Sequence, residues 1–264
     1  MWDADEYLHF ADYRERPFHE LIRRVGAGRP RRVVDAGCGP GTLTPALARR
    51  WPDAQVEAFD SSPEMVAAAR GRGVDAFVAD VADWSPPPDT DVIVCNAVLQ
   101  WVPEHLEVLR RWFTALSAGA WLAVQVPGNF TAPSHALTRE LAGQPRWRAR
   151  LAGVLREADA VHEPRVYAEH LAGLGAAVDV WESTYLQRLA GRDAALQWIS
   201  GTALRPVRAA LNDEDWSRFV AELAPRLRTA YPASRLAGAA EEGVWMPFRR
   251  IFVVAQVREE HATA

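Results

Sequence analysis

The stretch of sequence that decides the fold is RRVVDAGCGPGT, residues 31–42. Its apolar half has the composition of a β-strand, and three glycines follow at alternate positions, Gly37, Gly39 and Gly41. Glycine at such a turn lets the backbone approach a ligand closely and adopt angles that a Cβ forbids. A helical pattern begins near Thr42, and the first turn of a helix offers unpaired N–H groups to an anion. The stretch therefore predicts a nucleotide-type site at the carboxyl end of a first strand.

The spacing of the glycines separates two classes of cofactor. A dinucleotide fingerprint is G-x-G-x-x-G, and its third glycine would fall where Thr42 or Thr44 stands. The pattern D-x-G-x-G-x-G, which begins at Asp35, instead resembles the first motif of the methyltransferases that use S-adenosylmethionine (SAM). This resemblance implies a SAM site whose loop contains Asp35, Gly37, Cys38, Gly39 and Gly41.

Polar residues stand at the ends of the next predicted strands. Asp60 ends the second strand, where a carboxylate accepts the two ribose hydroxyls of an adenosine, and strand-end aspartates also cap helices. Asp80 ends the third strand and is the candidate for the adenine amino group, with Val81 donating from its backbone. Asn96 ends the fourth, where a backbone carbonyl would hold the cofactor's ammonium. We add Ser61 and Met65 from the start of the helix that follows Asp60, with Met65 and Trp84 as candidate walls around the adenine.

Strands and helices alternate along the first half of the chain. Apolar runs predict strands at 31–36, 55–59, 75–79, 90–95 and 121–126, with helical patterns at 15–25, 42–50, 61 onward and 104–116. This alternation predicts an α/β fold with a doubly wound, mostly parallel sheet. The pattern changes after residue 127. We expect mostly helix over 133–173 and 193–230, and two late strands, 178–189 and 251–257, at an antiparallel end of the same seven-stranded sheet.

Length fits a single domain over residues 1–264. We expect a core of residues 30–127 with 176–189 and 248–257, and a helical cap of residues 1–25, 128–173 and 190–245. No apolar run is long enough to span a bilayer, and the acidic N-terminus lacks the pattern of a signal peptide. The two cysteines, Cys38 and Cys95, have no metal-binding spacing and favour a reducing cytoplasm.

The balance of charge argues against nucleic acid as a partner. The chain has a formal net charge of −4 and no basic run. Lysine is absent, so arginine is the only permanent side-chain cation available to a substrate site. Arginine binds carboxylates through a two-pronged fork. No metal-ligand pattern is present, since the acidic run at 212–215 has the form of a helix N-cap followed by first-turn acids.

Segments beyond the glycine loop resemble a narrower family, the trans-aconitate 2-methyltransferases, over nearly the whole chain. The resemblance implies a Rossmann-like methyltransferase sheet and transfer of a methyl group from SAM to one carboxylate of trans-aconitate. Three places depart from the family pattern: residues 143–160, Leu186 and Arg249. The segments that carry the resemblance are YLHF (7–10), RP (16–17), NAVLQW (96–101), AVQVPGN (123–129), VDVWESTY (178–185), LRP (204–206) and RIFVVA (250–255).

The chemistry implied by this resemblance needs alignment rather than a strong base. A carboxylic acid has a pKa of about 4, so the acceptor is already ionised at neutral pH. The site has to align the reacting atoms and exclude water. Gln100 and Trp101, just past the fourth strand, are candidates for orientation and for a wall, and His9 is the third candidate catalytic residue.

A tricarboxylate carries about three negative charges, which are costly to bury without partners. We therefore expect cations and hydrogen-bond donors around the acceptor. Arg16 is a further candidate that either closes over the site or pairs with nearby acids. The candidate acceptor residues are Arg205 and Arg250 as cations, His9, His162, Tyr167 and Tyr185 as donors, and Arg16, Gln100 and Trp101.

Three other hypotheses stay open on the sequence. The acceptor is another small acid or a carrier-bound acid, or the protein binds SAM without turnover, or a nicotinamide cofactor takes the place of SAM. A carrier-bound acceptor would need a basic docking face, whereas a free tricarboxylate needs buried arginines.

Overall fold

The computed structural model describes residues 11–235 and 241–258. This part of the chain divides into two compact units, each assembled from separate segments. The sheet unit contains residues 14–127, 161–182 and 250–258. The helical unit contains residues 11–13, 128–160, 183–235 and 241–249. Residues 14–25 and 161–173, which we expected in the cap, therefore group with the sheet.

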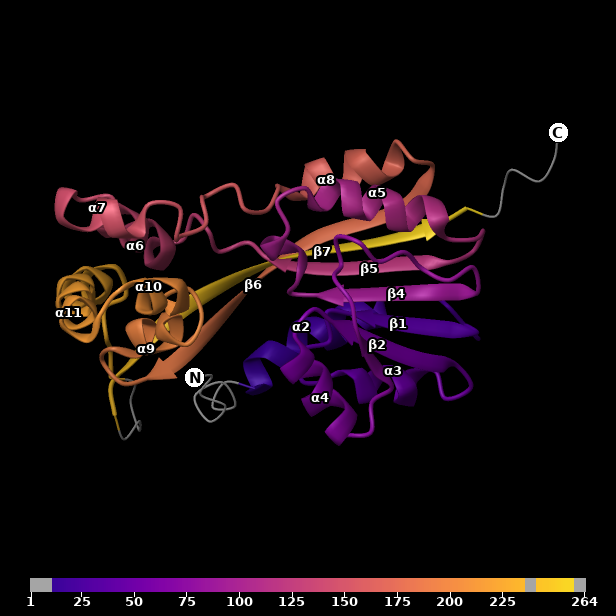
Figure 1. Cartoon of the computed structure of the whole chain (residues 1–264), viewed down its shortest axis with the longest axis horizontal. Helices are drawn as coiled ribbons and strands as arrows, with labels where there is room; N and C mark the ends of the chain where they lie inside the picture. The colour runs from indigo at the N-terminus through magenta and orange to yellow at the C-terminus, as the bar shows by residue number, and fades with distance from the viewer. Residues whose placement is uncertain (1–10, 236–240, 259–264) are drawn as a thin grey trace. The chain divides into compact units, whose positions relative to one another are not determined.

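Seven strands form one sheet in the order β3-β2-β1-β4-β5-β7-β6 (Figure 1). The first five strands are mutually parallel, and β7 runs antiparallel to β5, with Trp121 opposite Gln256 and Pro127 opposite Arg250. This arrangement confirms the predicted doubly wound sheet with an antiparallel end. The strands are β1 (Arg32–Ala36), β2 (Gln55–Asp60), β3 (Ala76–Val78), β4 (Thr90–Asn96), β5 (Trp121–Pro127), β6 (Ala176–Ala190) and β7 (Gly243–Val257).

Helices of the sheet unit cover the apolar residues of these strands. Alternate residues of the central strands, such as Ile93 and Val124, pack with Trp112 and Leu171 in one buried cluster. A smaller cluster joins Val66 and its neighbours to β2 and β3. Fully burying side chains of this size contributes about 1.5–3 kcal/mol each. The helices are α2 (Ala11–Arg23), α3 (Thr44–Arg50), α4 (Pro63–Gly71), the 3₁₀ helix η1 (Leu99–Trp101), α5 (His105–Ala115) and α8 (Pro164–Ala172).

The helical unit is built largely on α11 (Asp213–Ala230). Phe219 of this helix meets the buried ring of Trp147 edge-on, with centroids 5.4 Å apart. The side chain of Asn212 accepts the Asp215 N–H at 2.9 Å, which confirms the N-cap predicted for the acidic run. The other helices are α6 (Pro133–Ala142), α7 (Pro145–Leu151), α9 (Ala194–Ser200) and α10 (Arg205–Ala210).

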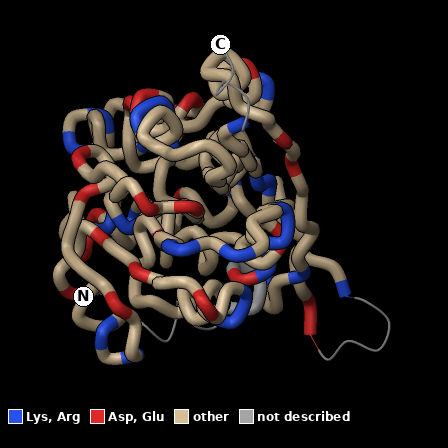
Figure 2. The backbone as a smooth tube through the Cα atoms, turned by 90° about the vertical axis from the view of Figure 1, so that its right-hand side faces the viewer, with Lys and Arg blue, Asp and Glu red and all other residues tan. Residues whose placement is uncertain are grey.

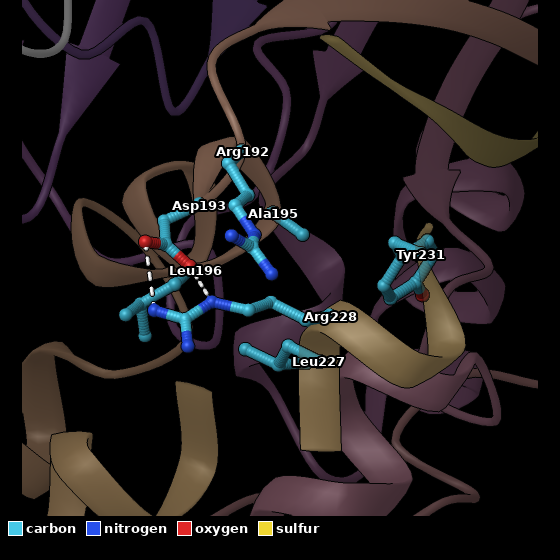
Figure 3. Close-up of a pocket in the computed structure, with 7 residues that line it drawn as sticks. All are labelled: Arg192, Asp193, Ala195, Leu196, Leu227, Arg228 and Tyr231. Carbon is cyan, nitrogen blue, oxygen red and sulfur yellow. Dashed lines mark hydrogen bonds and ion pairs between the residues drawn. The ribbon is translucent and has the colours of Figure 1, made fainter. Parts of the chain in front are cut away.

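A small recess lies between α9 and α11, and a two-pronged ion pair runs along it (Figure 3). Arg228 donates to Asp193 through Nε at 2.6 Å and Nη2 at 3.0 Å. The guanidinium lowers the pKa of Asp193. Asp193 precedes the first residue of α9, so the pair fastens the start of α9 to the end of α11.

Helix ends follow local signals that the sequence carries. Ser62 caps α4 by accepting the Met65 N–H at 3.3 Å, and Pro63 is the first residue of the helix, which agrees with the helical pattern predicted from residue 61 onward. The helical pattern predicted over 15–25 would put Pro17 in the first turn of its helix, and this expectation is wrong. The helix α2 begins at Ala11, so Pro17 lies in its interior rather than in its first turn. The helix after the glycine loop begins at Thr44, two residues later than predicted.

Residues of both signs are interspersed along the described backbone (Figure 2). Within the described residues, no helix combines the length and apolarity needed to cross a bilayer.

Candidate active site

The glycine loop after β1 adopts the conformation that its three glycines allow. Gly37, Gly39 and Gly41 have φ angles of 77°, 56° and 72°. A Cβ at Gly37 would lie 2.3 Å from a methyl of Val98, whereas a Cβ at Gly39 would meet nothing within 4 Å. Gly37 therefore permits tight packing against the loop after β4, and Gly39 faces open space.

Asp60 fixes the loop from the end of β2. One carboxylate oxygen accepts the Gly39 N–H at 2.9 Å, and the other accepts the Ser62 N–H at 2.9 Å. Each oxygen keeps a further lone pair, so the carboxylate is held in place and still able to accept two hydroxyls. Ser61, between Asp60 and the cap Ser62, is exposed.

The end of β3 is less constrained. Asp80 is exposed, and its carboxylate accepts the Ala82 N–H at 2.9 Å in a local turn. Val81 is buried. Trp84 stacks near Phe59, with centroids 4.7 Å apart, and the sulfur-bearing side chain of Met65 is partly exposed. The strands β3, β2 and β1 are parallel neighbours, so their carboxyl ends lie at the same edge of the sheet. Asp80, which follows β3, and the glycine loop, which follows β1, are therefore at that edge.

A strained turn follows β4. Ala97 has a φ of 58°, a left-handed conformation that costs a non-glycine residue about 1–3 kcal/mol. Two hydrogen bonds hold it there: its N–H donates to the Gln125 carbonyl at 2.8 Å, and its carbonyl accepts the Gln100 side-chain amide at 2.6 Å. The Oδ1 atom of Asn96 is buried and has no protein partner in the described chain. This turn places an unsatisfied acceptor at the expected ammonium end of the cofactor.

Tyr167 and His162 belong to a packed cluster with His105. Nδ1 of His105 lies 3.0 Å from the Val102 carbonyl, so it carries the proton, and Nε2 accepts the proton of the Tyr167 hydroxyl at 2.8 Å. The Tyr167 oxygen also accepts the His162 N–H at 3.2 Å. Burial raises the pKa of Tyr167 to about 12. The tyrosine proton is thus committed to His105, and our proposal for the acceptor site leaves Tyr167 out.

The remaining acceptor candidates fall in different parts of the chain. In the sheet unit, Gln100 is buried, Trp101 is 59% exposed, and Arg250 faces Pro127 across the β5–β7 pair. Arg16 donates to Glu20 at 2.7 Å, which matches the pairing alternative. In the helical unit, Tyr185 is buried on β6 and Arg205 is exposed at the first position of α10. His9 lies outside the described residues.

Thiol and metal chemistry find no support in the geometry. Burial raises the pKa of Cys38 to about 12 and raises that of Cys95 further, so neither thiol is an ionised nucleophile at neutral pH. Across residues 11–235 and 241–258, no three His, Cys, Asp or Glu side chains are grouped to hold a metal ion.

Sequence reasoning missed two contributors. Gln125 contributes its backbone carbonyl, which accepts the Ala97 N–H, and because any residue has such a carbonyl the sequence carries no signal for this role. His105 gave none, because its partner Tyr167 is 62 residues away and only the fold joins them.

Asp35 gives a prediction for the dependence of stability on pH. Burial raises the pKa of its carboxyl from 3.8 to about 6, partly opposed by the 2.6 Å hydrogen bond from Thr44 and helped by Asp60. The folded state therefore holds a proton that the unfolded state releases between pH 4 and 6, and stability from this group falls across that window as pH rises. We expect Asp35→Asn to gain about 3 kcal/mol in unfolding free energy relative to the parent between pH 4 and pH 7.

Urea denaturation at a series of pH values measures this difference. Asp91→Asn is the matched control with the opposite sign, because hydrogen bonds from Arg31 lower the pKa of Asp91. It should lose stability relative to the parent above pH 4. A difference for Asp35→Asn that stays flat from pH 4 to 7 would contradict the raised pKa.

Comparisons with known proteins agree with this geometry. A family model described as a methyltransferase domain matches residues 7–175. The trans-aconitate 2-methyltransferase of Rhodococcus jostii is 60% identical over 259 residues, which is 98% of this chain and all of the relative. Among solved structures, the YcgJ protein of Bacillus subtilis superimposes with a TM-score of 0.58 at 14% identity, covering 92% of this chain and 99% of that one.

A phosphoethanolamine methyltransferase of Haemonchus contortus, solved with phosphomonomethylethanolamine and S-adenosylhomocysteine, gives a TM-score of 0.53 at 15% identity. The match covers 92% of this chain and about half of that enzyme, 53%. The strand order, the glycine loop and the fixed carboxylate after β2 define a class I methyltransferase. Within that class, the chain belongs to the family of trans-aconitate 2-methyltransferases.

Proposed function

We propose that this protein transfers a methyl group from SAM to a carboxylate of trans-aconitate and releases a monomethyl ester. The observation that supports trans-aconitate as the acceptor is the 60% identity to a protein named trans-aconitate 2-methyltransferase, over the full length of that relative. A small-molecule carboxylate is then the partner of the site, in place of nucleic acid or a membrane. Cytoplasmic location is part of the same proposal, and the two unbridged thiols Cys38 and Cys95 are compatible with it.

The residues after β1, β2 and β4 fit SAM. The open side of Gly39 leaves room beside the Asp60 carboxylate, and the buried Oδ1 of Asn96 lacks a protein partner in the described chain. We assign ribose binding to Asp60, adenine binding to Asp80 and Val81, and an adenine wall to Met65. The loop residues Asp35, Gly37, Cys38, Gly39 and Gly41, with Ser61 and Asn96, complete the proposed cofactor site.

Bound SAM supplies a methyl carbon on a sulfonium, so a carboxylate oxygen forms the C–O bond while the S–C bond breaks and its electron pair stays on sulfur. The protein's part is to position and to desolvate. The Ala97 turn, held by Gln100 and Gln125, fixes the end of β4 where the reacting groups meet. Trp101, which is 59% exposed, is our candidate for covering the acceptor and excluding water.

Cations have to balance the acceptor. Arg250 and Arg205 remain our candidates for its carboxylates, with Arg16, His162, Tyr185 and His9 as further donors. Because the acceptor is ionised well below neutral pH, no side chain is required as a general base.

The test uses pure protein, SAM with a labelled methyl group and a panel of free acids. We expect trans-aconitate to give a labelled ester with the mass of a monomethyl product. If a different acid is esterified and trans-aconitate is not, that acid is the acceptor and our proposal for trans-aconitate is wrong. Retention of SAM in equilibrium dialysis without any ester would favour a binding protein, and loss of both would overturn the proposed function.

A further inference from the structure

The turn after β3, residues 80–84, contains both residues that we assign to the adenine, and we call it the adenine turn. Two hydrogen bonds to the Asp80 carbonyl close it, from the Asp83 N–H at 3.1 Å and from the Trp84 N–H at 2.9 Å. The Asp80 carboxylate accepts the Ala82 N–H at 2.9 Å within the same turn. These three bonds set the shape of the turn, but they are internal to it and do not set its place beside the sheet.

Two neighbouring residues of α5 hold the adenine turn from outside. Nη2 of Arg111 donates to the Val81 carbonyl at 3.0 Å and to the Trp84 carbonyl at 3.3 Å. The indole N–H of Trp112 donates to the same Trp84 carbonyl at 3.0 Å. The Nη2 group has two N–H bonds, one for each carbonyl, and a carbonyl oxygen has two lone pairs, so both donors find room at Trp84. The turn is thus attached to α5 near both of its ends.

The part of α5 that supplies these donors is firmly packed. Trp112 is fully buried and belongs to the same apolar cluster as Val108 and Leu109 of this helix. Its ring meets the Trp84 ring edge-on with centroids 5.5 Å apart, and the Trp84 ring lies 4.7 Å from that of Phe59 on β2. A binding group that is supported by a packed helix is held closer to its working geometry than one on an unsupported loop.

One peptide group links Arg111 to the Asp80 carboxylate. The peptide between Val81 and Ala82 has its carbonyl bonded to the guanidinium and its N–H bonded to the carboxylate. Because a peptide unit is planar, a donor that fixes the carbonyl also fixes the direction of the N–H, and with it the carboxylate that accepts this N–H. A charged donor on the carbonyl also polarises the amide and strengthens its N–H as a donor. Arg111 therefore acts on both the place and the orientation of the Asp80 carboxylate.

The preceding arginine of the same helix is used differently. Arg110 is exposed, and its Nε donates to the Glu107 carboxylate at 2.8 Å, one turn back along α5. An exposed pair of this kind contributes little to stability. Arg111 instead bonds two carbonyls that lie 27 and 30 residues away in the sequence. Two adjacent arginines thus differ in whether their side chains bond the adenine turn, which makes one the natural control for the other.

We propose that Arg111 is a positioning residue for the adenine of SAM: by holding the adenine turn through its carbonyls, it sets the Asp80 carboxylate and the Val81 N–H at the spacing that recognises a 6-amino purine. This inference rests on the proposed function, since it takes SAM as the ligand and the end of β3 as the adenine site. Adenine presents an amino donor beside a ring-nitrogen acceptor, which complements a carboxylate beside an N–H. The 6-oxo base hypoxanthine presents an acceptor beside a protonated ring nitrogen, so it leaves both protein groups without a partner.

The test measures the binding of S-adenosylhomocysteine and of S-inosylhomocysteine, which carries the 6-oxo base, by calorimetric titration of the whole protein. The parent should bind the adenosine compound at least about 10-fold more tightly, because the 6-oxo base loses two hydrogen bonds. In Arg111→Leu this ratio of affinities should fall at least about 5-fold, because a displaced carboxylate no longer meets the amino group. Arg110→Leu, the matched control, should keep the ratio of the parent.

Two further variants separate positioning from a general structural role. Arg111→Lys keeps a charge and enough N–H groups for both carbonyls, so its ratio should stay within about 2-fold of the parent. In an Asp80→Ala background, Arg111→Leu should change the ratio less than about 2-fold, because the group that it positions is gone. A purely structural role would weaken both ligands equally, leave the ratio unchanged and appear in urea denaturation as a lower free energy of unfolding.

The outcomes distinguish this inference from the function on which it rests. If the parent esterifies trans-aconitate and Arg111→Leu keeps the parent's ratio, Arg111 does not position the adenine site and the proposed function stands. If the ratio falls as expected but no acid is esterified, the role of Arg111 stands and the proposed methyl transfer is wrong. If the parent binds the two compounds equally, the inference is overturned together with the assignment of Asp80 to the adenine. If the parent binds neither, the proposed function is overturned as well.

Discussion

Gly37→Ala is expected to lower the free energy of unfolding by about 2–5 kcal/mol, the sum of a left-handed backbone strain and an overpacked contact. Gly37 has a φ of 77°, and the added methyl would lie 2.3 Å from one Val98 methyl and 2.9 Å from the other. Val98 belongs to the segment beside the strained Ala97, so either the glycine loop or the β4 turn has to move. Urea denaturation measures the loss.

Gly39→Ala separates folding from binding at the same loop. Its φ of 56° gives a comparable backbone strain, but its Cβ would meet no atom within 4 Å. We expect a loss of only about 1–2 kcal/mol in stability and at least a 10-fold weaker affinity for SAM, because the methyl occupies the proposed ligand space. Gly73→Ala is the control, since Gly73 has a φ of 79° with open space around it and lies outside the proposed site. If Gly39→Ala binds SAM as tightly as the parent, the proposal that SAM lies on this side of the loop is wrong.

Asp60→Ala should weaken SAM binding on the order of 100-fold or more, since hydrogen bonds to a charged group contribute about 1.5–3 kcal/mol each. The variant loses the two proposed ribose contacts and also releases the N–H groups of Gly39 and Ser62. Calorimetric titration with S-adenosylhomocysteine, which keeps the ribose, gives the affinity directly.

Two comparisons make the Asp60 result specific. Asp83→Ala changes an exposed aspartate near the end of β3 that is not part of the proposed site, and it should bind like the parent. The affinity of Asp80→Ala for S-adenosylhomocysteine should lie between those of Asp60→Ala and Asp83→Ala, because the Asp80 carboxylate is exposed and shapes only a local turn. Equal affinities for Asp60→Ala and Asp83→Ala would rule out Asp60 as the ribose partner.

The fold could be predicted from the sequence because most strands and helices show their own hydrophobic periodicity and have capping or turn residues at their ends. The strand ending at Asp60, the cap at Ser62 and the N-cap at Asn212 are local signals, and the structure confirms them. Pro17 was misplaced because a proline is usually found in a first turn, and tertiary packing of α2 overrides that preference here. The strand β6 exceeds the predicted range 178–189 by only three residues. The strand β7 begins at Gly243, eight residues before the predicted start at 251, because its first half does not share the apolar pattern of the central sheet.

The candidate site was predictable only in part. The glycine loop and the strand-end acids follow from spacing alone, because parallel strands bring their carboxyl ends to one edge. The commitment of the Tyr167 proton to His105 depends on packing between α5 and α8, which no spacing encodes.

The strand order has a consequence for how the polypeptide is made. In the described sheet, β6 pairs with β7 alone, and β7 follows β6 in the sequence and lies between β5 and β6. A ribosome therefore delivers β6 well before β7, the strand that pairs with it, and leaves β5 with an open flank until β7 has been made. Unpaired strand borders invite association with other chains. The nascent chain has to avoid association through these open strand borders until β7 emerges, and the pairing of β7 with β5 and β6 completes the sheet.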